Sequence, residues 1–209
     1  MKIYSHIFKT RLPAGRQGFT LIEMLVSVAL FSVVMVMALG ALLSLSTADR
    51  KAQALKSSVD NLNFALDSMS RTIRTGYNYH CGSSSGGDCK AGNNTFYFTA
   101  NNGVVTAYRL ESLTVDSNAA AICGQTIATP GCLAISVGGG AWASITSPDV
   151  IINDLSASNS YSFHLWGTTT GDNIQPIVVI TLSGYAQVST TQQSAFHLQT
   201  TVTQRIYDQ

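Results

Sequence analysis

Charged side chains are scarce in this chain of 209 residues. Asp, Glu, Lys and Arg make up only 11% of the sequence, against roughly a quarter in ordinary soluble proteins. Beyond residue 18 the chain holds 8 bases against 11 acids, and no stretch is rich in Lys or Arg. A basic surface that neutralises nucleic-acid phosphates is therefore excluded, and we predict no nucleic-acid partner. The apolar content of 45% likewise excludes a disordered chain.

Proline is also rare, and none of the four prolines lies between residues 19 and 75. Within this segment, residues 24–46 carry no charge. A helix of that length measures roughly 35 Å, enough to cross a hydrocarbon core of about 30 Å. Residues 1–18 carry four bases and no acid, which places the N-terminus in the cytoplasm and the chain beyond about residue 48 outside. The sequence thus predicts a single-pass protein of the cytoplasmic membrane, in contact with the lipid bilayer.

Two simpler interpretations of this segment stay open. One is an ordinary signal peptide cleaved near Ser46–Thr47–Ala48, although such peptides have apolar cores of only about 7–15 residues. The other is a plain membrane anchor carrying an external binding domain. Neither explains Glu23, an acid at the start of the apolar run. An ionisable residue there is a candidate functional group, unless it merely lies among the lipid headgroups.

The run Gly18-Phe19-Thr20-Leu21-Ile22-Glu23 follows a short basic leader and precedes an apolar helix. This order resembles the processing signal of type IV pilins and pseudopilins. The resemblance implies that a prepilin peptidase cleaves between Gly18 and Phe19, removes the leader (residues 1–18) and methylates the new amino group of Phe19. It also implies that Glu23 pairs with the Phe19 amine of a neighbouring subunit during filament assembly. An unpaired carboxylate is costly in a medium of low dielectric constant, and a charge pair recovers part of that cost.

A helical pattern continues after the apolar run. Apolar residues recur at spacings of three and four along one stripe: Leu55, Val59, Leu62, Leu66, Met69 and Ile73. Gly76 is a natural stop, so we predict one helix over residues 19–75, with a transmembrane part (24–46) and an amphipathic part (47–75). The stripe fits a short coiled coil, but packing on a sheet of the same chain is favoured.

Residues 76–209 read as a β-rich extracytoplasmic domain. Asn102-Gly103 predicts a hairpin between two of its strands, and Ile177–Leu182 reads as a central strand buried on both faces. The last strand alternates apolar and polar residues from Phe196 to Ile206. No strong helical pattern follows residue 75, so the sequence predicts an α+β fold: one long helix packed on an antiparallel sheet. The predicted strands cover residues 96–99, 104–110, 133–137, 150–155, 161–166, 177–182 and 196–206.

The four cysteines allow three disulfide pairings. Locality favours Cys81 with Cys89 and Cys123 with Cys132, which suits an exterior location. A zinc site that includes His80 is the alternative, although neither pair has the close spacing of structural zinc sites.

Other candidate motifs lack their structural context. Gly82–Gly86 spells G-x-S-x-G without the strand and helix of a nucleophile elbow. His164 and His197 fall on the polar faces of strands and read as solvent-exposed. Three acids (Asp149, Asp154 and Asp172) are too dispersed to indicate a calcium site. We therefore predict no catalytic residues, no metal and no cofactor, and a protein that is not an enzyme.

The resemblance implies a structural subunit of a type IV pilus or type II secretion-like filament, periplasmic or on the cell surface. Its partners would be prepilin peptidase, other pilin or pseudopilin subunits and a membrane assembly platform. Major type IV pilins usually close a C-terminal disulfide loop, whereas no cysteine follows Cys132 here. The terminal strand is similar to that of minor pseudopilin J, which indicates a minor pilin or minor pseudopilin. The alternative is a membrane protein that never polymerises and carries an external binding domain.

Overall fold

A computed structural model describes residues 18–82, 87–113, 116–153, 161–169, 171, 174–187 and 193–205. The chain divides into two compact units, Met1–Thr47 and Ala48–Gln209. Several features singled out in the sequence lie outside the described residues: leader residues 1–17, Ser84 of the G-x-S-x-G run, Asp154, Asp172 and Ile206.

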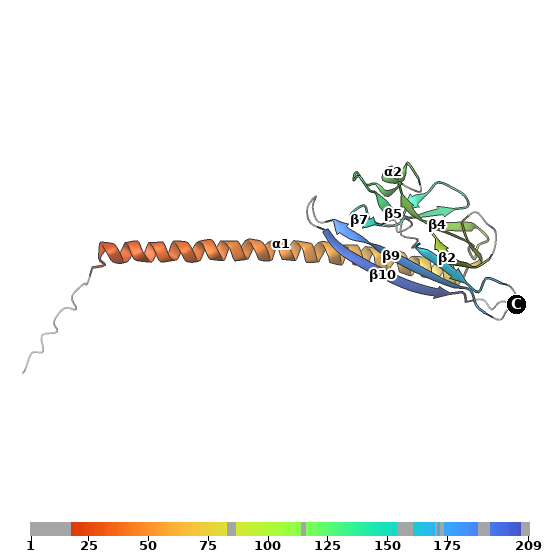
Figure 1. Cartoon of the computed structure of the whole chain (residues 1–209), viewed down its shortest axis with the longest axis horizontal. Coiled ribbons are helices and arrows are strands. Elements are labelled where there is room, and N and C mark those ends of the chain that lie inside the picture. Colours follow the sequence, from red (N-terminus) through yellow and green to blue (C-terminus); the bar gives the residue numbers. More distant parts are fainter. Residues whose placement is uncertain are drawn as a thin grey trace, which may run out of the picture. The chain divides into compact units, whose positions relative to one another are not determined.

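Helix α1 (Leu21–Arg74) is continuous, as the absence of proline from this segment predicts (Figure 1). In the first unit the large apolar side chains of α1 are exposed, from Leu21 to Leu45. This part of the helix is long and apolar enough to cross a membrane. No described residue buries these apolar side chains, so any molecule that covers them lies outside the described chain.

The second unit contains two antiparallel sheets (Figure 1). The first has the strand order β1-β3-β4-β5-β6, and the second has the order β10-β9-β8-β2, with β7 also paired to β9. A short helix, α2 (Ala119–Cys123), packs on β4 and β5. The strands are β1 (Tyr77–Cys81), β2 (Cys89–Asn93), β3 (Thr95–Thr99), β4 (Val105–Ser112), β5 (Gly131–Val137), β6 (Ala143–Ser144), β7 (Val150–Ile152), β8 (Phe163–Trp166), β9 (Ile177–Gln187) and β10 (Gln193–Thr203).

One apolar core joins the second half of α1 to both sheets. The predicted stripe of α1 supplies four of its members, while the other two, Leu55 and Val59, are half-buried. Aromatic rings of β3 and β8 fill the centre of this core. The ring centroid of Phe96 lies 5.6 Å from that of Phe98 and 5.9 Å from that of Phe163. The prediction of an α+β fold, with a long helix packed on antiparallel sheet, is confirmed.

The end of α1 is fixed by three backbone and side-chain contacts. The Gly76 N–H donates to the Ile73 carbonyl at 2.8 Å, and the Tyr79 hydroxyl donates to the same carbonyl at 2.6 Å. The Arg205 N–H donates to the Arg74 carbonyl at 2.8 Å. A Cβ atom at residue 76 would collide with the Phe98 ring, so glycine at this position serves close packing as well as helix termination.

The structure corrects four details of the sequence analysis. The strands form two sheets instead of one. Strand β9 is central, but within the predicted residues 177–182 only Val178, Ile180 and Leu182 are buried, while the alternate residues are half-buried on the other face. Helix α2 was not anticipated because five residues are too few for a periodic pattern. His164 is half-buried instead of solvent-exposed, since its ring stacks on Trp166 and its Nδ1 lies 3.2 Å from the Lys90 carbonyl oxygen.

Candidate functional site

The N-terminal end of α1 is capped by the residues around the predicted cleavage point. The Thr20 Oγ1 accepts a hydrogen bond from the Glu23 N–H at 3.3 Å, and the Thr20 carbonyl accepts one from the Met24 N–H at 3.2 Å. Thr20 therefore acts as the N-cap, and Glu23 occupies the third helical position. The T-x-x-E spacing is a capping signature that the sequence analysis did not use.

The carboxylate of Glu23 is exposed and forms no hydrogen bond or ion pair with any other residue that the structure describes. It lines an open hollow of about 540 Å³ together with Gly18, Phe19 and Thr20. The structure thus brings the predicted cleavage point and the predicted assembly residue to one place. An acid at a helix N-terminus is favoured by the helix dipole, and this one retains its full capacity to bind a cation.

Among the residues that the structure describes, none requires glycine at position 18. A Cβ atom built on it meets nothing within 4 Å, and its φ lies outside the positive region that favours glycine. Any requirement for a small residue here must therefore come from a molecule that binds the junction.

The apolar part of α1 presents few open polar groups. The hydroxyls of Ser27 and Ser32 donate to the Glu23 and Val28 carbonyls at 2.7 and 2.8 Å, and the Thr47 hydroxyl donates to the Leu43 carbonyl at 2.7 Å. Each of these hydroxyls is satisfied within the helix, as a lipid environment requires. Glu23, by contrast, is an ionisable group in this segment whose side chain has no partner among the described residues.

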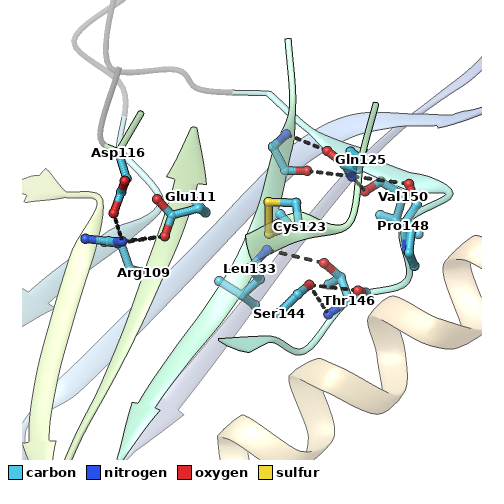
Figure 2. The surroundings of a disulfide bond; sticks show 12 residues. Arg109, Glu111, Asp116, Cys123, Gln125, Leu133, Ser144, Thr146, Pro148 and Val150 are labelled. Carbon is cyan, nitrogen blue, oxygen red and sulfur yellow. Dashed lines mark hydrogen bonds and ion pairs between the residues drawn. A yellow bond between two sulfur atoms is a disulfide. The ribbon is translucent and has the colours of Figure 1, made fainter. Parts of the chain in front are cut away.

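The cysteines of the second unit form two disulfides, Cys81–Cys89 and Cys123–Cys132, with Cα–Cα distances of 6.1 and 5.6 Å. The first bond links β1 of one sheet to β2 of the other. The second fastens α2 to β5, as Figure 2 shows. Both bonds are local, and each joins elements that hydrogen bonds of the sheets do not connect directly.

A buried ionic cluster lies beside the second disulfide (Figure 2). Arg109 and Glu111 lie two residues apart on one face of β4, and the Arg109 Nε donates to Glu111 at 3.0 Å. Arg109 also binds Asp116 at 3.2 Å and lies 4.2 Å above the Trp142 ring. The Glu111 side chain is fully buried, and its Oε1 has no hydrogen-bond partner among the described residues. Burial raises the pKa of the Glu111 carboxyl, and the Arg109 guanidinium acts in the opposite direction.

The sequence analysis missed this cluster, although a signal was present. Arg109 lies in the predicted strand 104–110 and Glu111 directly follows it, so the two opposite charges fall on one face if the strand continues by one residue. Gln125 is a second missed residue, with a structural role: its side chain donates to the Val150 carbonyl at 2.9 Å and accepts from the Gly131 N–H at 2.8 Å (Figure 2). Both features stabilise the loops around α2, and neither places a nucleophile beside a general base.

The cysteines that an alternative zinc site would use are bonded to one another. His80 stacks on Tyr97 with ring centroids 5.1 Å apart, and the exposed His197 lies on β10. Within the described ranges no group of three or more His, Cys, Asp or Glu side chains is arranged to hold a metal ion.

The long apolar helix, which begins beside Gly18 and Phe19, fits a membrane-anchored protein. Residues 13–45 match the family model of the prokaryotic N-terminal methylation motif, which supports membership of the type IV pilin and pseudopilin family. The identification made from the sequence is confirmed at this level, whereas the closer similarity to pseudopilin J is not. A search of the curated proteins and a search of the solved structures each gave no match.

Proposed function

We propose that this protein is a minor structural subunit of a type IV pilus or type II secretion-like filament, and not an enzyme. In this proposal prepilin peptidase cleaves between Gly18 and Phe19 and methylates the new amino group. The first unit then assembles with other pilin or pseudopilin subunits on a membrane platform, while the second unit lies outside the cytoplasmic membrane.

The observation that carries this proposal is the free carboxylate of Glu23 beside the junction. Cleavage creates a positive amino group on Phe19, in the hollow that Glu23 lines. No other described residue neutralises Glu23, and the surrounding apolar surface of α1 is uncovered. When α1 helices pack together, the carboxylate of one subunit meets the amino group of the next, and the pair sets their axial register. Fixing register is the best-attested use of a polar pair in an apolar interface.

The exposed apolar surface supports the same arrangement. Before assembly this surface contacts lipid, and afterwards it contacts neighbouring helices, so the transfer from membrane to filament does not expose it to water. The proposal of a minor role is based on the sequence. Major type IV pilins usually close a C-terminal loop with a disulfide, and no cysteine follows Cys132 in this sequence.

The first experiment measures the intact mass of the full chain purified from membranes of a host that has a prepilin peptidase. We expect a chain that begins at methylated Phe19 and carries two disulfides. A chain that still begins at Met1 would favour the non-polymerising membrane protein. A start near Asp49 would identify an ordinary secreted domain and overturn the proposal.

The second experiment tests assembly in the native host with Glu23→Ala and Glu23→Gln, and with Glu23→Asp as the control that keeps the charge. We expect the two neutral variants to be cleaved and inserted normally but absent from sheared filaments, and Glu23→Asp to retain partial incorporation. Equal incorporation of all three variants would show that the carboxylate has no role in assembly.

A further inference from the structure

Strand β10 forms one border of the second sheet (Figure 1). It pairs with β9 over its whole length, from Gln193 to Thr203, in an unbroken register without a bulge. At about 3.3 Å per residue the strand extends roughly 36 Å. A long, regular edge strand is a template for pairing with another chain unless something blocks it.

The hydrogen bonds of β9 show which residues of β10 face outward. The Thr181 N–H donates to the Ser162 carbonyl, and the Gln187 N–H donates to the Asp149 carbonyl, at 2.8 and 3.1 Å. Odd-numbered residues of β9 therefore direct their backbone groups away from β10, and even-numbered residues direct theirs toward it. In the register of the pair, Gly184 lies opposite Phe196 and Leu182 opposite Leu198.

The even-numbered residues of β10 are thus bonded to β9, and the odd-numbered residues present their N–H and C=O groups at the outer edge. Two bonds just beyond the strand agree with this alternation. The Gln204 N–H donates inward to the Pro176 carbonyl, and the Arg205 N–H donates outward to the Arg74 carbonyl. Within the described part of the chain, no backbone bond covers the outer groups of Ala195, His197, Gln199 and Thr201.

The two borders of the second sheet differ in protection. At the opposite border, β2 is fastened to β1 of the first sheet by the Cys81–Cys89 disulfide. No disulfide to a described residue covers β10 in this way. The strand also contains no proline and no Asp, Glu, Lys or Arg, which are the usual devices that block an edge. On its core-facing side Leu198 and Thr200 are only half-buried between the buried Phe196 and Val202. These two side chains are therefore partly accessible from outside the described residues.

A second copy of this chain does not fit the edge well. The end of β10 is bonded to the end of α1 through Arg205 and Arg74, and β10 runs in the same direction as the adjacent part of α1 (Figure 1). In an antiparallel pair of β10 strands, the Ala48 ends of the two helices would lie at opposite ends of the pair, whereas both ends lead into the apolar part of α1. A parallel pair related by a twofold axis, with each residue opposite its own copy, would bring the outward groups of both strands to the same height, so that donor meets donor.

We propose that the outer edge of β10 binds an extended, uncharged segment of a different protein, which adds one strand to the second sheet. Main-chain hydrogen bonds to the four outward residues provide affinity, and alternate apolar side chains of the segment cover Leu198. This inference concerns the second unit alone and does not depend on cleavage at Gly18 or on filament assembly.

The first test measures residue-resolved amide hydrogen exchange on the full chain in detergent micelles. We expect the amides of His197, Gln199 and Thr201 to exchange at least about tenfold faster than those of Leu198 and Thr200, because only the latter are bonded to β9. Equal protection of both sets would show that the edge is already covered and would overturn the proposal.

The second test places the photo-crosslinker p-benzoylphenylalanine at Thr201 in native host membranes. We expect a crosslink to another protein, mapped to an uncharged extended segment. Gln199→Pro should abolish it by removing an outward N–H, a change that an edge strand tolerates. Gln199→Ala is the matched control and should retain it, while Gln199→Lys, which keeps the N–H and adds an edge charge, should weaken it.

A crosslink to a second copy of the chain, no crosslink to any protein, or a crosslink that survives Gln199→Pro would each overturn the proposal. Unchanged protection of the even-numbered amides verifies that each variant is folded. The mass of the N-terminus, read on the same samples, reports processing at Phe19 separately, so failure of this proposal and failure of the filament proposal are distinguishable.

Discussion

Side chains of the same kind are exposed in the first unit of this chain and buried in the second. In the first unit Phe31 is 63% exposed, whereas in the second unit Phe96 is completely buried among other rings. Each buried large apolar side chain contributes about 1.5–3 kcal/mol to stability. The second unit obtains this contribution from its own chain, while no described residue provides it for the first unit.

Acidic residues show the same contrast. Glu111 in the second unit is buried and bonded to Arg109, and Glu23 in the first unit has no partner among the described residues. A carboxylate already neutralised inside its own fold has little to offer another molecule, whereas a free one beside an apolar surface does. The difference indicates that the first unit is built to bind and the second to be stable by itself.

The largest expected effect that tests this contrast between the two units is a loss of cleavage between Gly18 and Phe19. We expect Gly18→Val to reduce cleavage by prepilin peptidase to near zero while leaving the stability of the second unit unchanged, because no described residue beyond its chain neighbours lies within 4 Å of a Cβ there. Intact mass measures the processed fraction. Gly40→Val is the matched control, since Gly40 also has open space around it. Normal cleavage of Gly18→Val, or loss of cleavage in Gly40→Val, would contradict the assignment of the junction.

A pair of phenylalanine substitutions sharpens the comparison within the second unit. Phe96→Ala removes a ring from the centre of the core and should lower the free energy of unfolding by about 3–5 kcal/mol. Phe64→Ala removes a ring that is 76% exposed on α1, and we expect a change within about 0.5 kcal/mol. Urea unfolding in mild detergent, followed by tryptophan fluorescence, measures both. Similar losses for the two variants would mean that Phe64 is covered in solution.

The parts of this structure that the sequence predicts are those with long, uniform patterns. The unbroken apolar run and the stripe ending at Ile73 locate α1, and the alternation from Phe196 to Val202 locates β10. The motif around Gly18 was recognised because its residues follow one another directly in the chain, and residues 13–45 match the family model of that motif.

The parts that could not be predicted depend on contacts between distant segments. The division into two sheets is set by which strands pair, and β2 joins β8 although about seventy residues separate them. Helix α2 is too short for periodicity and is held by a disulfide. Glu111 carries the residue type of an exposed position, yet it is buried because α2 packs over that face of the sheet.

Breaking the buried ion pair should cost more than breaking an exposed one. Glu111→Ala leaves Arg109, whose side chain is only 14% exposed, without its closest partner. We expect a loss of about 3 kcal/mol in unfolding free energy, toward the low end for buried pairs because Asp116 and Trp142 remain. The control Asp67→Ala removes an exposed pair with Arg71 on α1 and should cost under about 0.5 kcal/mol. A loss below about 1 kcal/mol for Glu111→Ala would show that the pair contributes no more than a surface pair.

Removing the second disulfide should have a slightly smaller effect. The double substitution Cys123→Ser with Cys132→Ser opens a short loop, and the chain-entropy model gives a loss of roughly 2.5 kcal/mol. Because this bond fastens α2 over the ionic cluster, we also expect faster exchange of the Glu111 amide. Cys81→Ser with Cys89→Ser serves as the control, since that loop is of similar length but lies between β1 and β2. Equal exchange at Glu111 in both double variants would show that α2 stays in place without its disulfide.

The smallest effect concerns pH and follows from the raised pKa of Glu111. A carboxyl whose pKa is higher in the folded protein than in the unfolded chain binds its proton more readily when folded. Its contribution to stability therefore increases as pH falls through the folded pKa toward the unfolded value of about 4.3. Measured against Glu111→Gln, which does not titrate, the wild-type protein should gain stability between pH 7 and pH 5 in urea unfolding. The hydrogen bond from the Thr168 N–H lowers the pKa of Asp88. The loss of stability that protonation of Asp88 causes therefore occurs in more acidic solution, below the range from pH 7 to pH 5. A relative loss of stability in the wild-type protein would mean that the ion pair with Arg109 outweighs burial, and that even the second unit keeps its internal acid charged.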